Sequence, residues 1–163
     1  MIKERTFETR VNLPADARQR LIELLNRQLA DTFDLFSQAK QAHWNVKGPQ
    51  FHQMHELFDD LADQLRDHTD LIAERATALG GIAMGTARMA ARGSRIPEWD
   101  VEVTESQAAA NALAERYGVL AASTRDAIAV ADEHGDAGTS DLLTEVLRAV
   151  EKGLWFLEAH NQR

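Results

Sequence analysis

The chain contains no cysteine and only three prolines in 163 residues. The absence of cysteine excludes disulfides, thiolate metal sites and cysteine nucleophiles. A metal site in this chain must use histidine, aspartate and glutamate, whose nitrogen and oxygen donors suit iron, manganese or zinc better than soft metals. No apolar run approaches the roughly 18 residues that a membrane span requires, so we expect no membrane partner.

Positive charge is also scarce, because 18 lysines and arginines face 26 aspartates and glutamates, and the formal net charge is −8. This balance disfavours a nucleic-acid partner, since phosphate binding needs a basic patch. It suits a protein that attracts cations, although acidic charge that only keeps the chain in solution explains it equally well. The N-terminus lacks the apolar stretch of a secretory signal, and we therefore expect a cytoplasmic protein.

Helical periodicity, in contrast, is abundant. Apolar residues recur at spacings of three and four along four segments. We predict one domain over residues 1–163, with a short tail at 1–13 and helices at about 15–46, 51–79, 104–133 and 139–160. Pro14 fits the start of the first helix, and Gly48-Pro49 ends it. The third helix is expected to open with the capping-box pattern Thr104-Glu105-Ser106-Gln107.

The connection between the second and third predicted helices, residues 80–103, is long, whereas the other two connections are short. It contains Pro97 and several glycines, and it has room for one short helix around Thr86–Ala91. In the ferritin-like topology, a long crossover at this place carries the chain from one end of the bundle to the other. Helix number and loop lengths therefore predict an all-α, ferritin-like four-helix bundle.

Two pairs of potential metal ligands lie on the second predicted helix. His55 and Asp59 are four residues apart, as are Asp70 and Glu74, so the members of each pair share a helix face. At about 100° per residue from Met54, which lies on the apolar stripe, the four side chains lie between about 100° and 200°. They form a second stripe, on a side of the helix other than the bundle core.

The distance between these pairs limits how they can be used. Their centres are about 15 residues, or about 22 Å, apart along the helix, whereas a metal ion binds its ligands at roughly 2 Å. In a two-fold dimer with antiparallel helices, His55 and Asp59 of one chain would face Asp70 and Glu74 of the other. His43 precedes the predicted turn, and the chain reversal there can bring it beside the first pair. The alternative is that these are ordinary solvated charges.

A series of motifs covers nearly the whole chain and reads His43-Trp44-Asn45-Val46-Lys47-Gly48, Phe51, His55-Glu56, Asp59, Asp70, Ala73-Glu74-Arg75, Leu79-Gly80-Gly81 and Leu154-Trp155-Phe156-Leu157-Glu158-Ala159-His160. In residues and spacing it resembles the Dps family, the DNA-binding proteins from starved cells. The resemblance implies a homo-oligomer, a hollow dodecamer built from two-fold dimers. It also implies a ferroxidase that oxidises Fe(II) with hydrogen peroxide or dioxygen, stores ferric mineral and protects DNA from oxidative damage.

The resemblance assigns the metal ligands to two subunits. His43, His55 and Asp59 would come from one subunit, and Asp70 and Glu74 from its partner. The shared site would hold one or two iron ions, with zinc as a substitute.

Further roles follow from the same resemblance. Trp44 resembles an aromatic residue of the family that quenches stray oxidants, although interface packing explains it about as well. In the family, acidic residues around the turn between the last two helices line three-fold pores that draw cations inward. The candidates here are Asp132, Asp136 and Asp141, although Ala137 stands at one pore position of the family.

Two departures from related proteins bear on function. The Glu-x-x-His pairs of ordinary ferritin di-iron bundles are absent, which argues against a site inside one subunit. The N-terminal tail balances Lys3, Arg5 and Arg10 with Glu4 and Glu8, unlike the lysine-rich tails of DNA-binding members. Direct DNA binding is therefore doubtful, while association with the nucleoid stays open. The alternatives are a DNA-compacting structural protein with a secondary iron role and a helical scaffold without metal.

Overall fold

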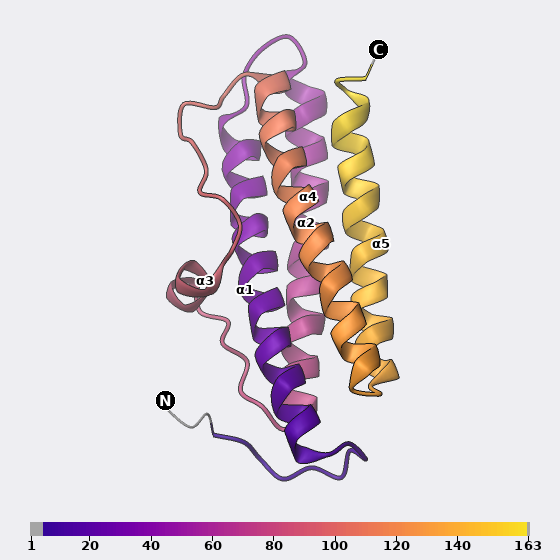
Figure 1. Ribbon diagram of the computed structural model, residues 1–163. Helices are drawn as coiled ribbons and strands as arrows, with labels where there is room; N and C mark the ends of the chain where they lie inside the picture. Colours follow the sequence, from indigo (N-terminus) through magenta and orange to yellow (C-terminus); the bar gives the residue numbers. More distant parts are fainter. Residues whose placement is uncertain (1–4, 163) are drawn as a thin grey trace.

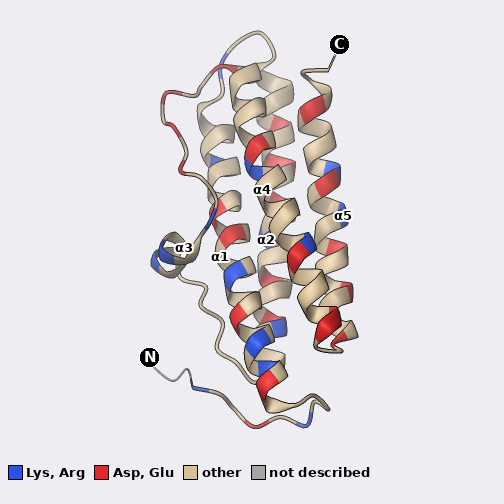
Figure 2. Ribbon diagram, in the orientation of Figure 1, with Lys and Arg blue, Asp and Glu red and all other residues tan. Residues whose placement is uncertain are grey.

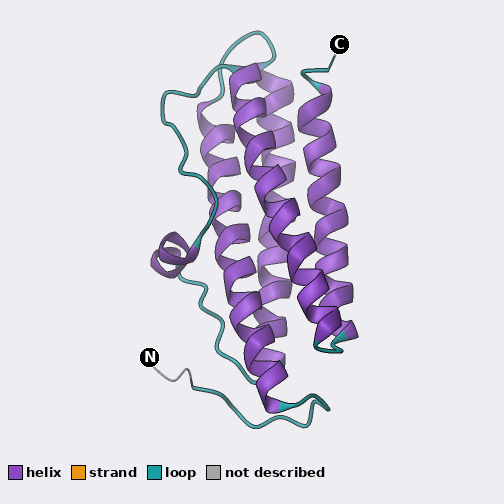
Figure 3. Cartoon of the chain, viewed as in Figure 1, coloured by secondary structure: helices purple, strands orange, loops and turns teal. Residues whose placement is uncertain are grey.

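The computed structural model describes residues 5–162, which form helices and connecting loops (Figures 1 and 3). The helices are α1 (Ala15–Asn45), α2 (Phe51–Ala78), α3 (Ala87–Gly93), α4 (Ser106–Glu133) and α5 (Ala137–Ala159). No strand occurs in this part of the chain. Four long helices form the bundle, and the short α3 lies against α1 within the long connection. The predicted all-α, ferritin-like four-helix bundle with a long crossover is confirmed. Lys3 and Glu4 of the expected tail lie outside the described residues.

The start of α4 differs from the predicted capping box. The helix begins at Ser106, and its N-cap is Glu105, whose carboxylate accepts a hydrogen bond from the backbone N–H of Ala108 at 2.9 Å. The carbonyl of Thr104 instead accepts a bond of 2.7 Å from the backbone N–H of Lys47, in the turn between α1 and α2. The predicted cap residue therefore joins the α1–α2 turn to the segment that enters α4, at one end of the bundle.

The core is one cluster of apolar side chains supplied by all four long helices. α1 packs mainly on α2, and α4 on α5. Full burial of a leucine or phenylalanine contributes roughly 1.5–3 kcal/mol relative to exposure, so this cluster is the main source of stability. Where α5 crosses the core, a Cβ on Gly153 would lie 2.7 Å from the Tyr117 ring, so only glycine permits this close approach.

Two buried polar contacts hold the crossover against the bundle. Asp31 of α1 is fully buried and accepts hydrogen bonds from the backbone and guanidinium of Arg95 at 2.6–3.0 Å. Arg116 of α4 donates to Gln38 of α1 at 2.6 Å and to the carbonyl of Glu98 at 2.5 Å. The connection is therefore fixed along the outside of α1 (Figure 1).

Acidic and basic residues are interspersed along α1 (Figure 2). No helix within residues 5–162 is long and apolar enough to cross a membrane.

Candidate metal centre

His43 and His55 lie side by side, because the turn after α1 reverses the chain into α2. Nδ1 of His43 is 2.7 Å from the carbonyl oxygen of His55, and Nδ1 of His55 is 2.8 Å from the carbonyl oxygen of His43. The two rings stack with centroids 3.8 Å apart. A carbonyl oxygen can only accept, so each Nδ1 must carry the hydrogen and donate it. In the neutral imidazole, Nε2 is then the nitrogen that carries the lone pair a metal ion requires.

Asp59 lies one helical turn beyond His55. Its Oδ1 is 3.9 Å from Nε2 of His43 and 2.5 Å from Nζ of Lys40. The hydrogen bond from Lys40 lowers the pKa of Asp59 below its usual value, against a smaller opposing effect of burial. Two imidazole nitrogens and one ionised carboxylate thus gather at one end of the α1–α2 pair.

Lys40 is the site residue that sequence reasoning missed. It lies one turn before His43 on α1, and that i, i+3 spacing is the signal that could have found it. Its ammonium also lies 5.7 Å from the ring centroid of Trp44. Trp44 is 62% exposed, and Phe51 beside the ring of His55 is exposed as well. The site is therefore bordered by aromatic surface that the single chain leaves open to solvent.

Asp70 and Glu74 lie on exposed positions of the same helix, about 22 Å from the first group along the uninterrupted α2. The arginines nearest to them in sequence are both engaged with other carboxylates. Arg66 pairs with Asp63 at 3.0 Å, and Arg75 pairs with Asp136 at 2.7 Å. The two carboxylates are therefore left without an arginine from their own helix to offset their mutual repulsion.

One protomer does not assemble a metal site by itself. Across residues 5–162, no group of three or more histidine, aspartate or glutamate side chains could hold a metal ion. The structure thus brings His43, His55 and Asp59 toward one another and leaves Asp70 and Glu74 apart from them. Of two alanines near the ligand stripe, Ala62 is fully buried in the chain's own core, and only Ala73 is partly open to another surface.

The three predicted pore acids do not share one environment. Asp132 and Asp141 are exposed, as a pore requires. Asp136 is 4% exposed and is the N-cap of α5, where its carboxylate accepts from the backbone N–H groups of Gly138 and Thr139 and from Arg75. This carboxylate is committed within the protomer, so a pore role rests on Asp132 and Asp141. The cap also starts α5 two residues before the predicted position, at Ala137.

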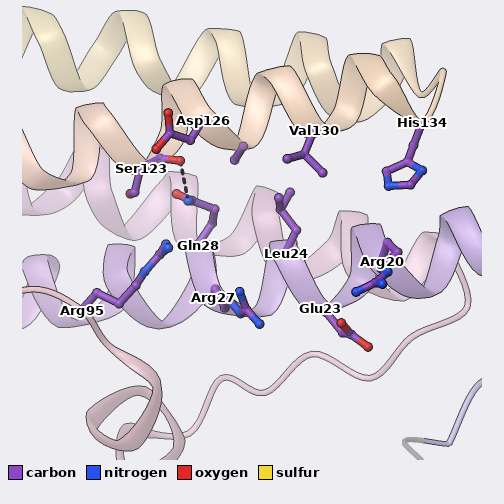
Figure 4. Close-up of a pocket in the computed structure, with 11 residues that line it drawn as sticks. Arg20, Glu23, Leu24, Arg27, Gln28, Arg95, Ser123, Asp126, Val130 and His134 are labelled. Carbon is purple, nitrogen blue, oxygen red and sulfur yellow. Dashed lines mark hydrogen bonds between the residues drawn. The ribbon is translucent and has the colours of Figure 1, made fainter.

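A hollow of about 500 Å³ lies elsewhere, between α1, α4 and the crossover (Figure 4). The side chains that line it include Arg20, Arg27 and Arg95 together with Glu23 and Asp126. None of the predicted metal ligands borders it, and its charges are of both signs. The candidate metal ligands therefore lie outside this hollow, and His43, His55 and Asp59 lie on the open surface near the start of α2.

Comparisons with known proteins find relatives in both sequence and fold. A model of the ferritin-like domain matches residues 22–163. The chain is 42% identical over 158 residues to the DNA protection during starvation protein of Agrobacterium fabrum, covering 97% of this chain and 98% of that protein. Among solved structures, it is similar to DpsC from Streptomyces coelicolor, with 35% identity, a TM-score of 0.93 and coverage of 100% and 96%.

A second solved structure carries a description of its chemistry. The Dps protein of Vibrio cholerae O1, described as a member of a broad superfamily of ferritin-like diiron-carboxylate proteins, is 27% identical with a TM-score of 0.89. The similarity covers 94% of this chain and 96% of that one. The matches extend over nearly the whole chain in sequence and in fold, and the chain belongs to the Dps family of ferritin-like proteins.

Proposed function

We propose that this protein is a ferroxidase and iron store whose metal sites lie between two copies of the chain. One observation carries the proposal. His43 and His55 hold each other's rings through Nδ1, which leaves Nε2 of His43 facing Asp59, yet the other candidate ligands are about 22 Å away along α2. A two-fold partner with α2 antiparallel would supply its Asp70 and Glu74 to complete the site.

The proposed ligands have chemistry that fits Fe(II) as substrate. The two neutral imidazoles offer nitrogen donors, and Asp59 and Glu74 are anionic anchors, with Asp70 as a ligand or as a hydrogen-bond partner of one. Three carboxylates at one site also favour the more highly charged Fe(III) product. Two Fe(II) ions give one electron each to one hydrogen peroxide, which takes up two protons and leaves as two waters, so no hydroxyl radical is released.

The wider role follows from the family. The Agrobacterium fabrum relative is named for DNA protection during starvation, and we propose the same role here, through removal of Fe(II) and peroxide. We further propose a hollow dodecamer of two-fold dimers in the cytoplasm that stores ferric mineral. Fe(II) would enter through pores lined by Asp132 and Asp141, and Trp44 would intercept stray oxidants at the site.

Single carboxylate substitutions test the proposed site. Asp59→Asn and Glu74→Gln should each lower the initial rate of Fe(II) oxidation by peroxide by at least about tenfold, because each removes an anionic ligand. Asp60→Asn is the matched control, since Asp60 is an exposed neighbour of Asp59 on a different face of α2. Unchanged rates in the Asp59 and Glu74 variants would refute the site, as would an equal loss in the control.

A further inference from the structure

Lys40 places a positive charge at the position where a metal ion would meet Asp59. Its Nζ is 2.5 Å from Oδ1 of Asp59. The same oxygen is 3.9 Å from Nε2 of His43. The Lys40 side chain is only 23% exposed, so it is held against the protein and does not extend freely into solvent. We call His43, His55 and Asp59 of one protomer the half-site. The structure therefore shows the ammonium of Lys40 bound to the carboxylate of this half-site.

A metal ion bound at Oδ1 of Asp59 would lie close to this ammonium. The short charge-assisted hydrogen bond uses a lone pair of Oδ1, and an iron ion about 2 Å from that oxygen would repel the ammonium. We propose that Lys40 is a built-in competitor for iron, which occupies Asp59 until a divalent ion displaces it. This inference rests on the proposed function, because it assumes that Asp59 is a metal ligand.

The charges explain what such a competitor does. The charges of Asp59 and Lys40 cancel, so these two groups together give a single protomer no negative charge with which to attract a cation at His43 and His55. The partner's half would add two carboxylates whose neighbouring arginines are engaged elsewhere. Metal binding would thus become favourable only after two protomers meet. An unassembled chain would not bind Fe(II), and so would not oxidise it outside the assembly that stores the ferric product.

An opposite role for Lys40 predicts an opposite result. If the lysine served to orient Asp59 for the metal, its removal would loosen the carboxylate and weaken binding. If it competes, its removal frees the carboxylate and strengthens binding. The sign of the change in metal affinity therefore separates a competitor from a positioning residue.

The test is calorimetric titration of the assembled protein with Zn(II), which binds nitrogen and oxygen ligands without redox chemistry. We compare the wild type with Lys40→Gln, Lys40→Arg and Lys47→Gln, after size-exclusion chromatography shows equal assembly. Lys40→Gln should bind Zn(II) about tenfold more tightly, because a charge-assisted contact and a nearby repulsion are both lost. Lys40→Arg keeps the charge and should bind no more tightly than the wild type. Lys47→Gln removes an equal charge from the nearby turn and should change affinity by less than about twofold.

Each other outcome overturns the inference. Equal or weaker Zn(II) binding by Lys40→Gln, while the wild type binds normally, contradicts competition and leaves the proposed metal site intact. If Lys47→Gln raises the Zn(II) affinity as much as Lys40→Gln does, the affinity depends on the net charge of the protein and not on the contact between Lys40 and Asp59, which also overturns the inference. Absence of Zn(II) binding in every assembled variant, the wild type included, removes the metal site and the competitor together.

Discussion

Arg75 donates to both carboxylate oxygens of Asp136, at 2.7 and 3.0 Å, and so joins the end of α2 to the start of α5. Its Nε also donates to the hydroxyl of Thr139 at 3.0 Å. Glu74 directly precedes Arg75, so the helix end that would present Glu74 to a partner is fixed by contacts outside the proposed metal site. The same contacts also prevent Arg75 from neutralising Glu74.

The stability of the bundle should depend on this ion pair. Asp136→Asn keeps a side chain that can cap α5 but leaves Arg75 without a charged partner. We expect the free energy of unfolding to fall by about 1–3 kcal/mol, measured by chemical denaturation followed by circular dichroism. Asp141→Asn, at an exposed position of the same helix, should change it by less than about 0.5 kcal/mol. Equal effects of the two substitutions would contradict the structural role.

The difference between wild type and Asp136→Asn should depend on pH. Burial raises the pKa of Asp136, but hydrogen bonds from Thr139 and Arg75 outweigh it, so the pKa lies below the ordinary value of 3.8. A lowered pKa gives stability that is complete above the unfolded-state pKa and is lost as the pH falls through the folded-state value. The gap in unfolding free energy should therefore be constant from pH 7 to about 5 and shrink below about pH 4. A gap that widens in acid would contradict this assignment.

Entry of iron should depend on the exposed acids of the α4–α5 turn. Replacing both Asp132 and Asp141 with asparagine should slow Fe(II) oxidation at low Fe(II) concentration several-fold, because the field that concentrates cations at the pore is weakened. Zn(II) affinity at equilibrium should stay within about twofold, since the metal ligands are intact. A loss of affinity in place of a loss of rate would place these residues at the metal site and not in a pore.

Direct DNA binding should be weak. The formal charge is −8, and basic residues on α1 are interspersed with acidic ones (Figure 2), so α1 does not present a continuous basic stripe to the phosphates. In gel-shift experiments we expect no retarded band at physiological salt and, at most, a band at low salt that salt abolishes. Retardation that persists at physiological salt would favour the DNA-compacting alternative over iron chemistry as the main role.

Much of the fold and part of the site could be predicted from the sequence, because both follow from helix periodicity. The spacing of His55, Asp59, Asp70 and Glu74 alone indicates a stripe on α2, and the uninterrupted helix keeps its two ends apart. The long segment 80–103 alone indicates the crossover. Predicting these features requires only the geometry of a regular helix and the lengths of the connections. It does not require knowing which helices are in contact.

The parts that were missed depend on contacts between helices. The Lys40–Asp59 bond requires the register of α1 against α2, which is set by the turn between them. The i, i+3 spacing of Lys40 and His43 indicates only that both lie on one face of α1, and not that Asp59 lies opposite them. The same holds for the ion pair between Arg75 and Asp136, which joins α2 to α5 across a long separation in the sequence. The sharing of the site between subunits stays a prediction, since a single protomer contains only its two halves.

Mixed assemblies test that prediction most directly. One variant carries His55→Ala with Asp59→Ala, and the other carries Asp70→Ala with Glu74→Ala. Each alone should show no rapid Fe(II) oxidation. When the two are co-assembled in equal amounts, random pairing should restore about a quarter of the wild-type sites, because each mixed dimer then holds one intact site and one doubly damaged site. Recovery near that fraction supports a site shared between subunits, whereas no recovery in correctly assembled mixtures would contradict it.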